Sequence, residues 1–509
     1  MYKEKSSAEV SFKPGPWEGS LLEGLKAGRF SLPSSAFISA GIETARRLSA
    51  KSSPYTKHEV SPAWDALINY LSRKGLIEKQ TSYERWFSDG PKLYSASFVA
   101  NTRSLNTRGH SWVRSFSRGT SHIFEEALSK GIGEFLERYA LMEYQDDMLL
   151  RASSKTLENT KRKFLPLDSI GGFTEEQKKH FPEFQISEDA PVVWVEGKEL
   201  TSNTSALIPA QLVFWNYCRH RYGFEPVLRH SNTNGAAGGF TREMAAVSGL
   251  RELLQRDAFL MHWLTKSVPQ RIVPDTVTNS AFAKLLEEVR SLNIDVHFLK
   301  VTVDHETPTC TCVLVSNEST GKRPKVSLGG GCSSTYEDAM WDALREAVAT
   351  HRWLRDKAEN SEQLLFDAEA YQPFIDSSID QAKRLRVWAM PQMFPHFNWI
   401  LTGEGKNLSH LRREDMQRVD DTRELQRLVE FFKRKGSGYE IYMYDATTPV
   451  LESVGFASVK MIVPQLINLY LDEIYAPLAA ERLTLLKPGL APGANRVFSD
   501  FYTFPHPFP

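Results

Sequence analysis

Three long stretches with helical periodicity constrain the fold of this chain more than any other feature. In each stretch, apolar side chains recur at steps of three and four residues and form one buried stripe. The helices are predicted across residues 124–142, 246–261 and 340–354, each after a glycine-rich turn, near residues 118, 235 and 330. This recurrence suggests an internal pseudo-repeat, although no fixed period indicates a solenoid.

Strand-like runs alternate with these helices. Runs rich in β-branched and aromatic residues predict strands at residues 93–99, 191–195, 206–213 and within 293–331. Residues 150–190 are typical of a polar connection. The alternation predicts an α/β or α+β fold, in which mixed sheets pack against long helices.

The length and charge of the chain limit the classes of protein to which it can belong. At 509 residues the chain exceeds what one hydrophobic core usually supports, so two or more packed units are expected. Its 62 basic and 62 acidic residues balance, which disfavours nucleic-acid binding. No apolar run approaches the ~20 residues of a membrane span, and no secretory signal follows Met1. A soluble, cytoplasmic protein is therefore predicted.

The four cysteines do not suggest a disulfide framework in a chain this long. Cys310 and Cys312 are spaced to face the same side of a strand, so both are expected to be buried. A zinc site is the weaker alternative, because zinc modules use wider cysteine pairs.

Residues 1–94 are predicted to form an accessory region. Residues 1–60 are rich in Ser, Gly, Pro and Lys and are expected to be loosely folded. Ser61 and Pro62 then begin a helix that Gly75 ends. That helix could belong to a winged-helix module, but packing on the main domain, residues 95–509, is the favoured interpretation.

Two acidic motifs on different predicted helices share one spacing. Gly133–Arg138 and Arg251–Arg256 each place acidic or amide groups three residues apart before an arginine. Residues three apart lie on one face of a helix, so each motif can aim two oxygen atoms at a common point. Two such helices facing each other would form a cage for a hard cation such as Mg²⁺. The predicted metal ligands are Glu134, Glu137, Glu252 and Gln255.

A candidate nucleotide contact precedes the second helix. Asn234 offers an amide, and Gly235 exposes backbone N–H groups before a helix N-terminus, where a phosphate or ribose is favoured. The chain contains no Walker loop and no G-x-G-x-x-G motif that opens a helix after a strand. It also lacks the His-Glu-x-x-His and G-x-S-x-G motifs of zinc and serine hydrolases. The sequence therefore favours chemistry with ATP and Mg²⁺ outside the common nucleotide-binding folds.

The residues at the end of the sequence form a proline-rich tail, 504–509. Its alternate prolines, Pro505, Pro507 and Pro509, fix an extended, polyproline-like strand. Such a strand loses little conformational entropy when it is threaded into a groove.

Taken in order, these motifs resemble the YcaO-domain family, and within it the azoline-forming cyclodehydratases that modify ribosomal peptides. The resemblance covers roughly residues 95–509. It is carried by Ala127–Arg138, Asn234–Gly238 with Glu252, Ala343–Ala347, and the three prolines of the tail.

The resemblance implies a site for ATP and Mg²⁺. It implies that Glu134, Glu137 and Glu252 hold the metal. The implied nucleotide-binding residues are Ser121, Asn234, Gly235, Arg345 and Glu346. The tail is implied to lie at the active site, with Pro505, Pro507 and Pro509 as its catalytic residues.

The implied reaction is the ATP-dependent closure of a ring in a peptide. A Cys, Ser or Thr side chain attacks the preceding backbone carbonyl, and ATP phosphorylates the resulting oxygen so that phosphate leaves. The implied partners are an E1-like or ThiF-like leader-binding protein, an FMN-dependent dehydrogenase and the precursor peptide. Neither nucleic acid nor a membrane is expected as a partner, and a dimeric state is left open.

The chain departs from the family pattern at two positions. Gln255 replaces the second acid of the second motif, which removes a charge from the cation site. Asp342 stands where an arginine is expected, and Arg345 or Arg138 could supply the missing phosphate-pairing charge. Two alternatives therefore stay open, a non-catalytic ATP-binding scaffold and a YcaO enzyme that forms a thioamide or amidine. The tail argues against the second.

Overall fold

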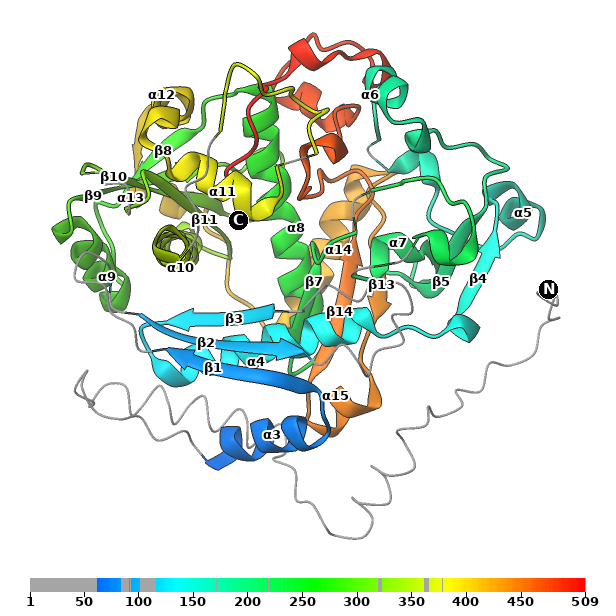
Figure 1. The fold of residues 1–509 in the computed structure, drawn as a ribbon, viewed down its shortest axis with the longest axis horizontal. Coiled ribbons are helices and arrows are strands. Elements are labelled where there is room, and N and C mark those ends of the chain that lie inside the picture. Colours follow the sequence, from blue (N-terminus) through cyan, green and yellow to red (C-terminus); the bar gives the residue numbers. More distant parts are fainter. Residues whose placement is uncertain are drawn as a thin grey trace.

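The fold is described by a computed structural model, shown in Figure 1 with colours that follow the sequence. It describes residues 62–83, 91, 93–100 and 116–508, with gaps at 171, 216, 218, 230, 319–322, 361–365 and 378. The predictions that concern residues 1–60, Ser61, Cys218 and Pro509 lie outside the described residues.

Three sheets form the framework of the molecule. The first is antiparallel, with the order β1-β2-β3. The second has the order β11-β10-β9-β8-β12, and the third has the order β4-β5-β13-β14-β7, with β6 paired to β5. The strands are β1 (Ile77–Tyr83), β2 (Tyr94–Ala100), β3 (Phe116–Ser121), β4 (Leu149–Ala152), β5 (Val192–Glu199), β6 (Thr204–Pro209), β7 (Ala236–Gly239), β8 (Gln270–Val273), β9 (Ile294–Lys300), β10 (Thr309–Ser316), β11 (Val326–Cys332), β12 (Gly405–Asn407), β13 (Tyr442–Asp445) and β14 (Ala457–Ile462).

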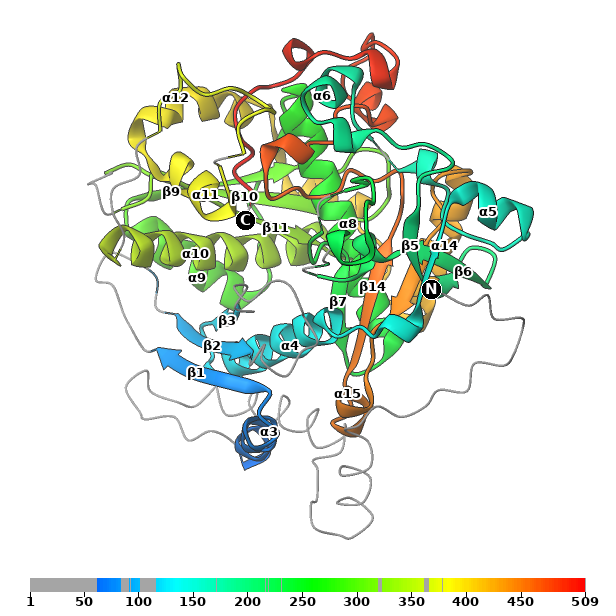
Figure 2. The ribbon, with the colours of Figure 1, turned by 45° about the vertical axis from the view of Figure 1, so that its right-hand side comes forward.

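Three long helices connect these sheets in a cycle. The first, α4 (Phe124–Met142), contacts β2 and β3 of the first sheet and β7 and β14 of the third. The second, α8 (Arg242–Thr265), contacts β7 and β14 as well as β10 and β11 of the second sheet. The third, α10 (Tyr336–Asn360), packs on β10 and β11 and reaches β3. Figure 2 shows α8 upright in the middle, with α4 and α10 on one side of it. All three helices confirm the predicted periodicity.

The remaining helices lie around this framework. They are α3 (Pro62–Arg73), α5 (Ser154–Asn159), α6 (Glu175–His180), α7 (Ala210–Val213), α9 (Ser280–Ser291), α11 (Gln381–Ala389), α12 (Phe394–Phe397), α13 (Leu408–Leu411), α14 (Asp421–Lys435) and α15 (Pro449–Ser453). None of the helices in the described part of the chain is both long enough and apolar enough to cross a membrane.

Two segments of the chain repeat one order of elements. The series α3-β1-β2-β3-α4 is matched by α9-β9-β10-β11-α10, with an antiparallel meander of three strands in both. The position of the strand against its helix is also the same in the two segments. A Cβ atom at Gly119 of β3 would lie 1.8 Å from the carbonyl oxygen of Ala127, and one at Gly331 of β11 would lie 2.0 Å from that of Ala339. In each case the glycine lies eight residues before its contact.

The glycine-rich segments near 118 and 330 are strands, and the prediction that they form turns is wrong. Gly119 lies within β3, and Gly330 lies within β11. The reason is the close approach of each helix to its strand, which leaves no room for a Cβ atom on the strand residue. At the second position the prediction is partly right, because Gly235 forms a turn with φ +79° before the short strand β7.

Two other segments differ from their predictions, because one strand is shorter and one connection contains regular elements. The strand predicted at 206–213 ends at Pro209, and Ala210–Val213 forms one helical turn, because proline has no N–H with which to continue a strand ladder. The connection at 150–190 contains β4, α5 and α6. The predicted burial of Cys310 and Cys312 in one strand, β10, is confirmed.

The N-terminal helix packs as the favoured interpretation predicts. Trp64, Leu67 and Leu71 of α3 are buried in the same core cluster as β2 and α4. The strand β1 that follows pairs with β2, so the predicted boundary between residues 94 and 95 falls at the start of a strand of the same sheet. The division into two domains stays a prediction.

Candidate functional site

Four glutamates lie where α4, α8 and α10 converge, and we call them the carboxylate cluster: Glu134, Glu137, Glu252 and Glu346. Three of them share one anchoring contact, in which a carboxylate oxygen accepts a hydrogen bond from a backbone N–H just before the same helix. These bonds run from Arg118 N to Glu134 at 2.6 Å, from Gly235 N to Glu252 at 2.6 Å and from Gly330 N to Glu346 at 2.5 Å. Each strand–helix unit therefore positions its own carboxylate.

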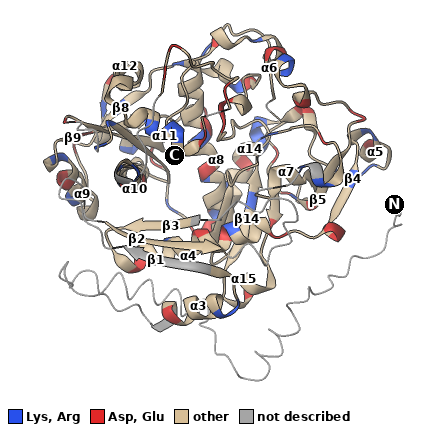
Figure 3. Ribbon diagram, in the orientation of Figure 1, with Lys and Arg blue, Asp and Glu red and all other residues tan. Residues whose placement is uncertain are grey.

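The arginine that ends each acidic motif pairs with the first glutamate of the same motif. Arg138 lies 2.6 Å from Glu134, and Arg256 lies 3.0 Å from Glu252, both one helical turn away. Glu134 and Glu252 are thus each held by one backbone amide and one guanidinium. Figure 3 shows acidic and basic positions close together where α4, α8 and β14 meet.

Glu137 is the member of the cluster whose ionised form is most disfavoured by its surroundings. Burial raises its pKa to about 8, and the neighbouring charges of Glu252 and Glu134 act in the same direction, against Arg138 and Lys460. A carboxylate in such surroundings gains stability from any added cation. This effect is the physical signature expected of a cation site before the cation is bound.

Lys460 of β14 is a buried cation beside this cluster, and it was missed by the sequence analysis. Burial lowers its pKa to about 7, while Glu252 and Glu137 favour its charged form. Its Nζ donates a hydrogen bond of 2.7 Å to the carbonyl of Asn232. The sequence gives little signal for this role, because one lysine in an apolar strand has no periodic partner.

The residues present fit a divalent cation by their chemistry. Carboxylate and amide oxygens are the ligands that Mg²⁺ takes in proteins. The Oδ1 atom of Asn234 is buried and has no hydrogen-bond donor, and the next residue, Gly235, bonds Glu252 through its N–H. In the part of the chain that the structure describes, no three acidic, histidine or cysteine side chains form a ready-made metal-binding group.

Asn234 and Gly235 adjoin the cluster through the bond from Gly235 to Glu252, and their predicted role in nucleotide binding stays a prediction. The Asn234 side-chain amide pairs with that of Asn468, and Gly235 donates its N–H to Glu252. A Cβ atom at Gly235 would lie 2.3 Å from the Met461 carbonyl oxygen, so only glycine fits this turn.

Gln255 lies on the side of the cluster that faces β11. A Cβ atom at Gly330 would lie 2.1 Å from Gln255 Nε2 and 2.7 Å from the ring of Phe508. Gln255 is therefore packed between a strand and the C-terminal tail. Its predicted role as a metal ligand stays a prediction.

A second group of charges lies at the N-terminal end of α4, and it contains Ser121 and Arg345. Both contact Glu126, which accepts 2.6 Å and 2.8 Å hydrogen bonds from them, and Lys130 lies 3.2 Å from the same carboxylate. Burial opposes the ionisation of Glu126, but Lys130, Ser121 and Arg345 together lower its pKa to about 2. Arg345 also pairs with Asp342. Asp342 therefore pairs with Arg345, the residue that was expected to replace the arginine charge missing at position 342.

Glu126 and Lys130 are the other site residues that the sequence analysis missed. A signal for them existed, because charged residues recur at every fourth position of α4, through Glu126, Lys130, Glu134 and Arg138. Residues four apart lie on one face of a helix. The charged stripe links the second group to the carboxylate cluster along one side of α4.

The proline tail runs through the interior and reaches the carboxylate cluster. Pro505, His506, Pro507 and Phe508 are buried. The ring of Phe508 packs 4.9 Å from that of Phe259 and lies 5.8 Å from the guanidinium of Arg256. The tail thus reaches the cation that pairs with Glu252.

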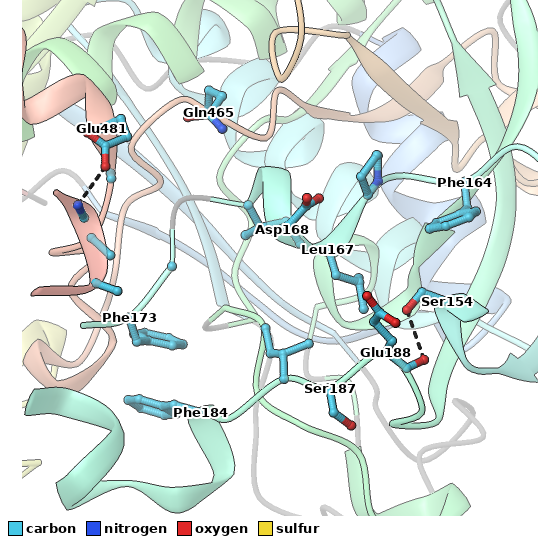
Figure 4. Close-up of a pocket in the computed structure, with 18 of the residues that line it drawn as sticks. Ser154, Phe164, Leu167, Asp168, Phe173, Phe184, Ser187, Glu188, Gln465 and Glu481 are labelled. Atoms are coloured by element: carbon cyan, nitrogen blue, oxygen red, sulfur yellow. Dashed lines mark hydrogen bonds between the residues drawn. The ribbon is translucent and has the colours of Figure 1, made fainter. Parts of the chain in front are cut away.

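A cavity of about 810 Å³ lies away from these residues, between α5, α6 and the segment around Glu481. Figure 4 shows Phe173 and Phe184 on one side of it and Glu188, which accepts a bond from Ser154 through its backbone, on another. It contains none of the predicted nucleotide- or metal-binding residues. The size of this cavity therefore does not identify it as the predicted site for ATP and Mg²⁺.

Three strand–helix units that present carboxylates to one another define an α/β protein with a candidate cation and nucleotide site. Residues 118–467 match the family described as YcaO cyclodehydratase, ATP- and Mg²⁺-binding. The chain belongs to the YcaO family, as its motifs predicted. ATP and Mg²⁺ are the ligands of this domain, and the heterocyclases of the family are ATP-dependent enzymes.

Solved structures share this fold. A heterocyclase in complex with substrate and cofactor superposes with a TM-score of 0.63 at 19% identity, over 85% of this chain and 55% of that one. YcaO from Methanopyrus kandleri, bound with AMPPCP and Mg²⁺, gives 0.56 at 17% identity, over 86% and 93% of the two chains. The Escherichia coli microcin synthetase McbBCD complex gives 0.55 at 13% identity, over 84% and 96%. The mixed α/β fold class is thereby confirmed.

One sequence relative covers a smaller part. An uncharacterized protein of Methanothermobacter thermautotrophicus is 29% identical over 156 residues, which are 30% of this chain and 40% of that protein. The chain therefore spans about two fifths of this relative and about half of the heterocyclase it matches.

Proposed function

We propose that this protein is an ATP-dependent cyclodehydratase that converts Cys, Ser or Thr residues of a ribosomal precursor peptide to thiazolines or oxazolines. One observation carries the proposal, the approach of the tail to the carboxylate cluster. Phe508 lies 5.8 Å from the Arg256 guanidinium, which is 3.0 Å from Glu252. A nucleotide site alone would also suit a scaffold or a thioamide-forming enzyme. A proline tail that reaches the carboxylates through Phe508 favours the ring-forming reaction.

The carboxylate cluster is the proposed metal-binding end of the site. Glu134, Glu137 and Glu252 supply carboxylates, and Asn234 supplies its unpartnered amide oxygen. In both Glu134 and Glu252, a backbone amide bonds one carboxylate oxygen and an arginine pairs with the other, so the two contacts together orient each carboxylate. When bound, Mg²⁺ neutralises phosphate charge and aligns the phosphoryl group for transfer.

The second group of charges is the proposed nucleotide-contacting end. Lys130 and Arg345 are cations held in place by Glu126, and Ser121 contributes a hydroxyl beside them. A cationic pair fixed by one carboxylate is pre-organised to bind phosphate or ribose oxygens. The charged face of α4 joins the two ends.

The proposed reaction activates a backbone amide. The thiol or hydroxyl of the peptide attacks the preceding carbonyl carbon and gives up its proton, and the carbonyl oxygen then receives the γ-phosphoryl group of ATP. The C–O bond breaks, phosphate departs with that oxygen, and loss of the amide proton leaves a C=N bond in the ring. ADP and phosphate are the other products. An amide oxygen is a poor leaving group, so the chemistry depends on this phosphorylation.

The proposed setting is a complex of several proteins. McbBCD is a microcin synthetase complex, and a further structure shows it with pro-MccB17 bound. By this likeness of fold, we propose an E1-like or ThiF-like partner that presents the precursor peptide. An FMN-dependent dehydrogenase, which would oxidise azolines to azoles, is proposed as a further partner.

The test is reconstitution with partner and precursor peptide. Each modified residue should lose the mass of one water while ATP is converted to ADP and phosphate. ATP binding without any loss of mass in the complete complex would contradict the proposal and favour the scaffold. A gain of sulfur in the presence of sulfide would favour thioamide formation instead.

A chain that lacks Pro507–Pro509 tests the role of the tail. The truncated protein should bind ATP with nearly unchanged affinity, because the carboxylates are held by α4, α8 and α10, but it should form rings far more slowly. The control is Glu137→Gln, which should weaken Mg²⁺-dependent ATP binding while it leaves the tail in place. Equal rates of ring formation with and without the last three residues would contradict a catalytic tail.

A further inference from the structure

Proline has no backbone N–H, and this restricts how a protein can hold the tail. Because residues 505 and 507 are prolines, the tail offers mainly carbonyl oxygens as handles. Side-chain donors that approach those carbonyls are therefore the groups that can fix its path. Among the residues that the structure describes, three side chains donate to carbonyls of the tail.

Two buried tryptophans donate to successive carbonyls of the tail. Trp263 of α8 donates its indole N–H to the Phe504 carbonyl at 3.0 Å, and Trp388 of α11 donates to the Pro505 carbonyl at 2.9 Å. The two indole rings meet edge to face, with centroids 5.4 Å apart. Trp263 lies on the same helix as Glu252 and Arg256. The entry of the tail is thus tied to the helix that carries part of the carboxylate cluster.

Arg384 of α11 holds the far end of the tail. This arginine is fully buried, and it donates to the Phe508 carbonyl at 3.3 Å and to the Tyr470 carbonyl at 2.9 Å. Its other neighbour is the buried carboxylate of Glu473, 3.9 Å away. His506, between the two contact points, bonds through Nε2 to the same Tyr470 carbonyl at 2.9 Å. The Tyr470 carbonyl is therefore shared by His506 of the tail and by Arg384, which holds the tail.

We infer that Arg384 and Trp388 of α11 form a clasp that positions the tail against the carboxylate cluster. Trp388 donates to the carbonyl of residue 505 and Arg384 to that of residue 508, and these two bonds fix which residue of the tail faces each donor. Phe508 is then held between Phe259, Gln255 and Gly330. The hydrogen bonds and ion pairs of Arg384 and Trp388 go to the tail, Tyr470 and Glu473 and not to the carboxylate cluster, so the two act through the tail as positioning residues. This inference rests on the proposed function for its catalytic consequence only.

The experiment compares two conservative variants with matched controls. Arg384→Lys keeps the charge beside Glu473 but cannot span the Tyr470 and Phe508 carbonyls with one planar group. Trp388→Phe keeps an aromatic ring but removes the donor to Pro505. The controls are Arg496→Lys and Trp194→Phe. Arg496 is equally buried and donates to the Leu478 and Ala480 carbonyls, and Trp194 donates to that of Ala152, all outside the tail.

Hydrogen exchange of the C-terminal peptide reports the position of the tail without any need for activity. Both clasp variants should exchange at His506 and Phe508 at least about tenfold faster than the unaltered protein, and neither control should. In the complete complex, kcat for ring formation should fall about tenfold, while the KM for ATP changes less than about twofold. Should the lysine variant fail to fold, the phenylalanine variant provides the same test.

Two results would overturn the inference. One is unchanged exchange of the tail in both clasp variants. The other is faster exchange with an unchanged kcat, which would show that the position of the tail does not matter for the reaction. If the unaltered complex forms no ring at all, the proposed function fails, and the exchange measurement still decides whether the clasp holds the tail.

Discussion

Replacement of Glu137 by glutamine should stabilise the protein when no cation is bound. The pKa of this carboxyl is raised from 4.5 to about 8, first by burial and then by Glu252 and Glu134. Because the folded state holds the proton more tightly than the unfolded state, folding stability falls as pH rises from 4.5 towards 8 and then levels off. The slope is about 1.4 kcal/mol per pH unit. Relative to its value at low pH, the folding stability lost because of Glu137 is therefore about 3 kcal/mol at pH 7 and approaches about 5 kcal/mol well above pH 8.

Urea unfolding in EDTA at pH 5.5, 7.0 and 8.5 measures this cost. Glu137→Gln carries no charge at any of these values, so its advantage over the unaltered protein should grow with pH to about 3–5 kcal/mol. Glu134→Gln is the contrasting control, because it breaks the pairing with Arg138 and should destabilise. With ATP and Mg²⁺ added, the unaltered protein should gain more stability than the Glu137 variant. Parallel pH profiles for the two proteins in EDTA would refute the reasoning.

Three further predictions concern the same region. Gly331→Ala should destabilise the folded protein by several kcal/mol, because its Cβ would lie 2.0 Å from the Ala339 carbonyl oxygen. A Cβ at Gly133 would have no atom within 4 Å, so Gly133→Ala should stabilise α4 by ~0.5–1 kcal/mol. Thermal unfolding of the two variants tests this contrast. Burial lowers the pKa of Lys460 to about 7, so the folding stability of the unaltered protein should rise between pH 7 and 10.5. Lys460→Met should remove this rise. In the control, unfolding at pH 6, the variant should be the more stable protein. Asn234→Leu should weaken Mg²⁺-dependent ATP binding about tenfold in calorimetry, and unchanged affinity would remove its amide oxygen from the site.

The positions of the long helices and of most site glutamates could be predicted because they follow from periodicity within single helices. Glu134 and Glu137 share a face by spacing alone, and the match with Glu252 pointed to a second helix. The sequence could not show that a backbone N–H from the preceding strand holds each anchored carboxylate. That contact depends on how closely strand and helix approach, and glycine in the strand permits it.

Other parts of the site depend on contacts between distant segments. Lys460 is separated from Glu137 by more than three hundred residues, and only the packing of β14 against α4 and α8 brings them together. The glycine-rich segments were taken for turns because glycine usually marks a break in regular structure. Here it marks close packing of a helix on a strand, and composition alone cannot separate these two uses.

The cyclic arrangement of three sheets and three helices separates the placement of the carboxylates from the rest of the chain. Each anchored glutamate takes its position from a strand or turn only sixteen or seventeen residues earlier. The long segments between the three units, such as residues 143–231 and 266–325, contribute no carboxylate to the cluster. Such segments can vary in length and sequence without moving the cluster, provided that the units still dock. A fold of this kind can change its outer surfaces and keep one cluster of carboxylates unchanged.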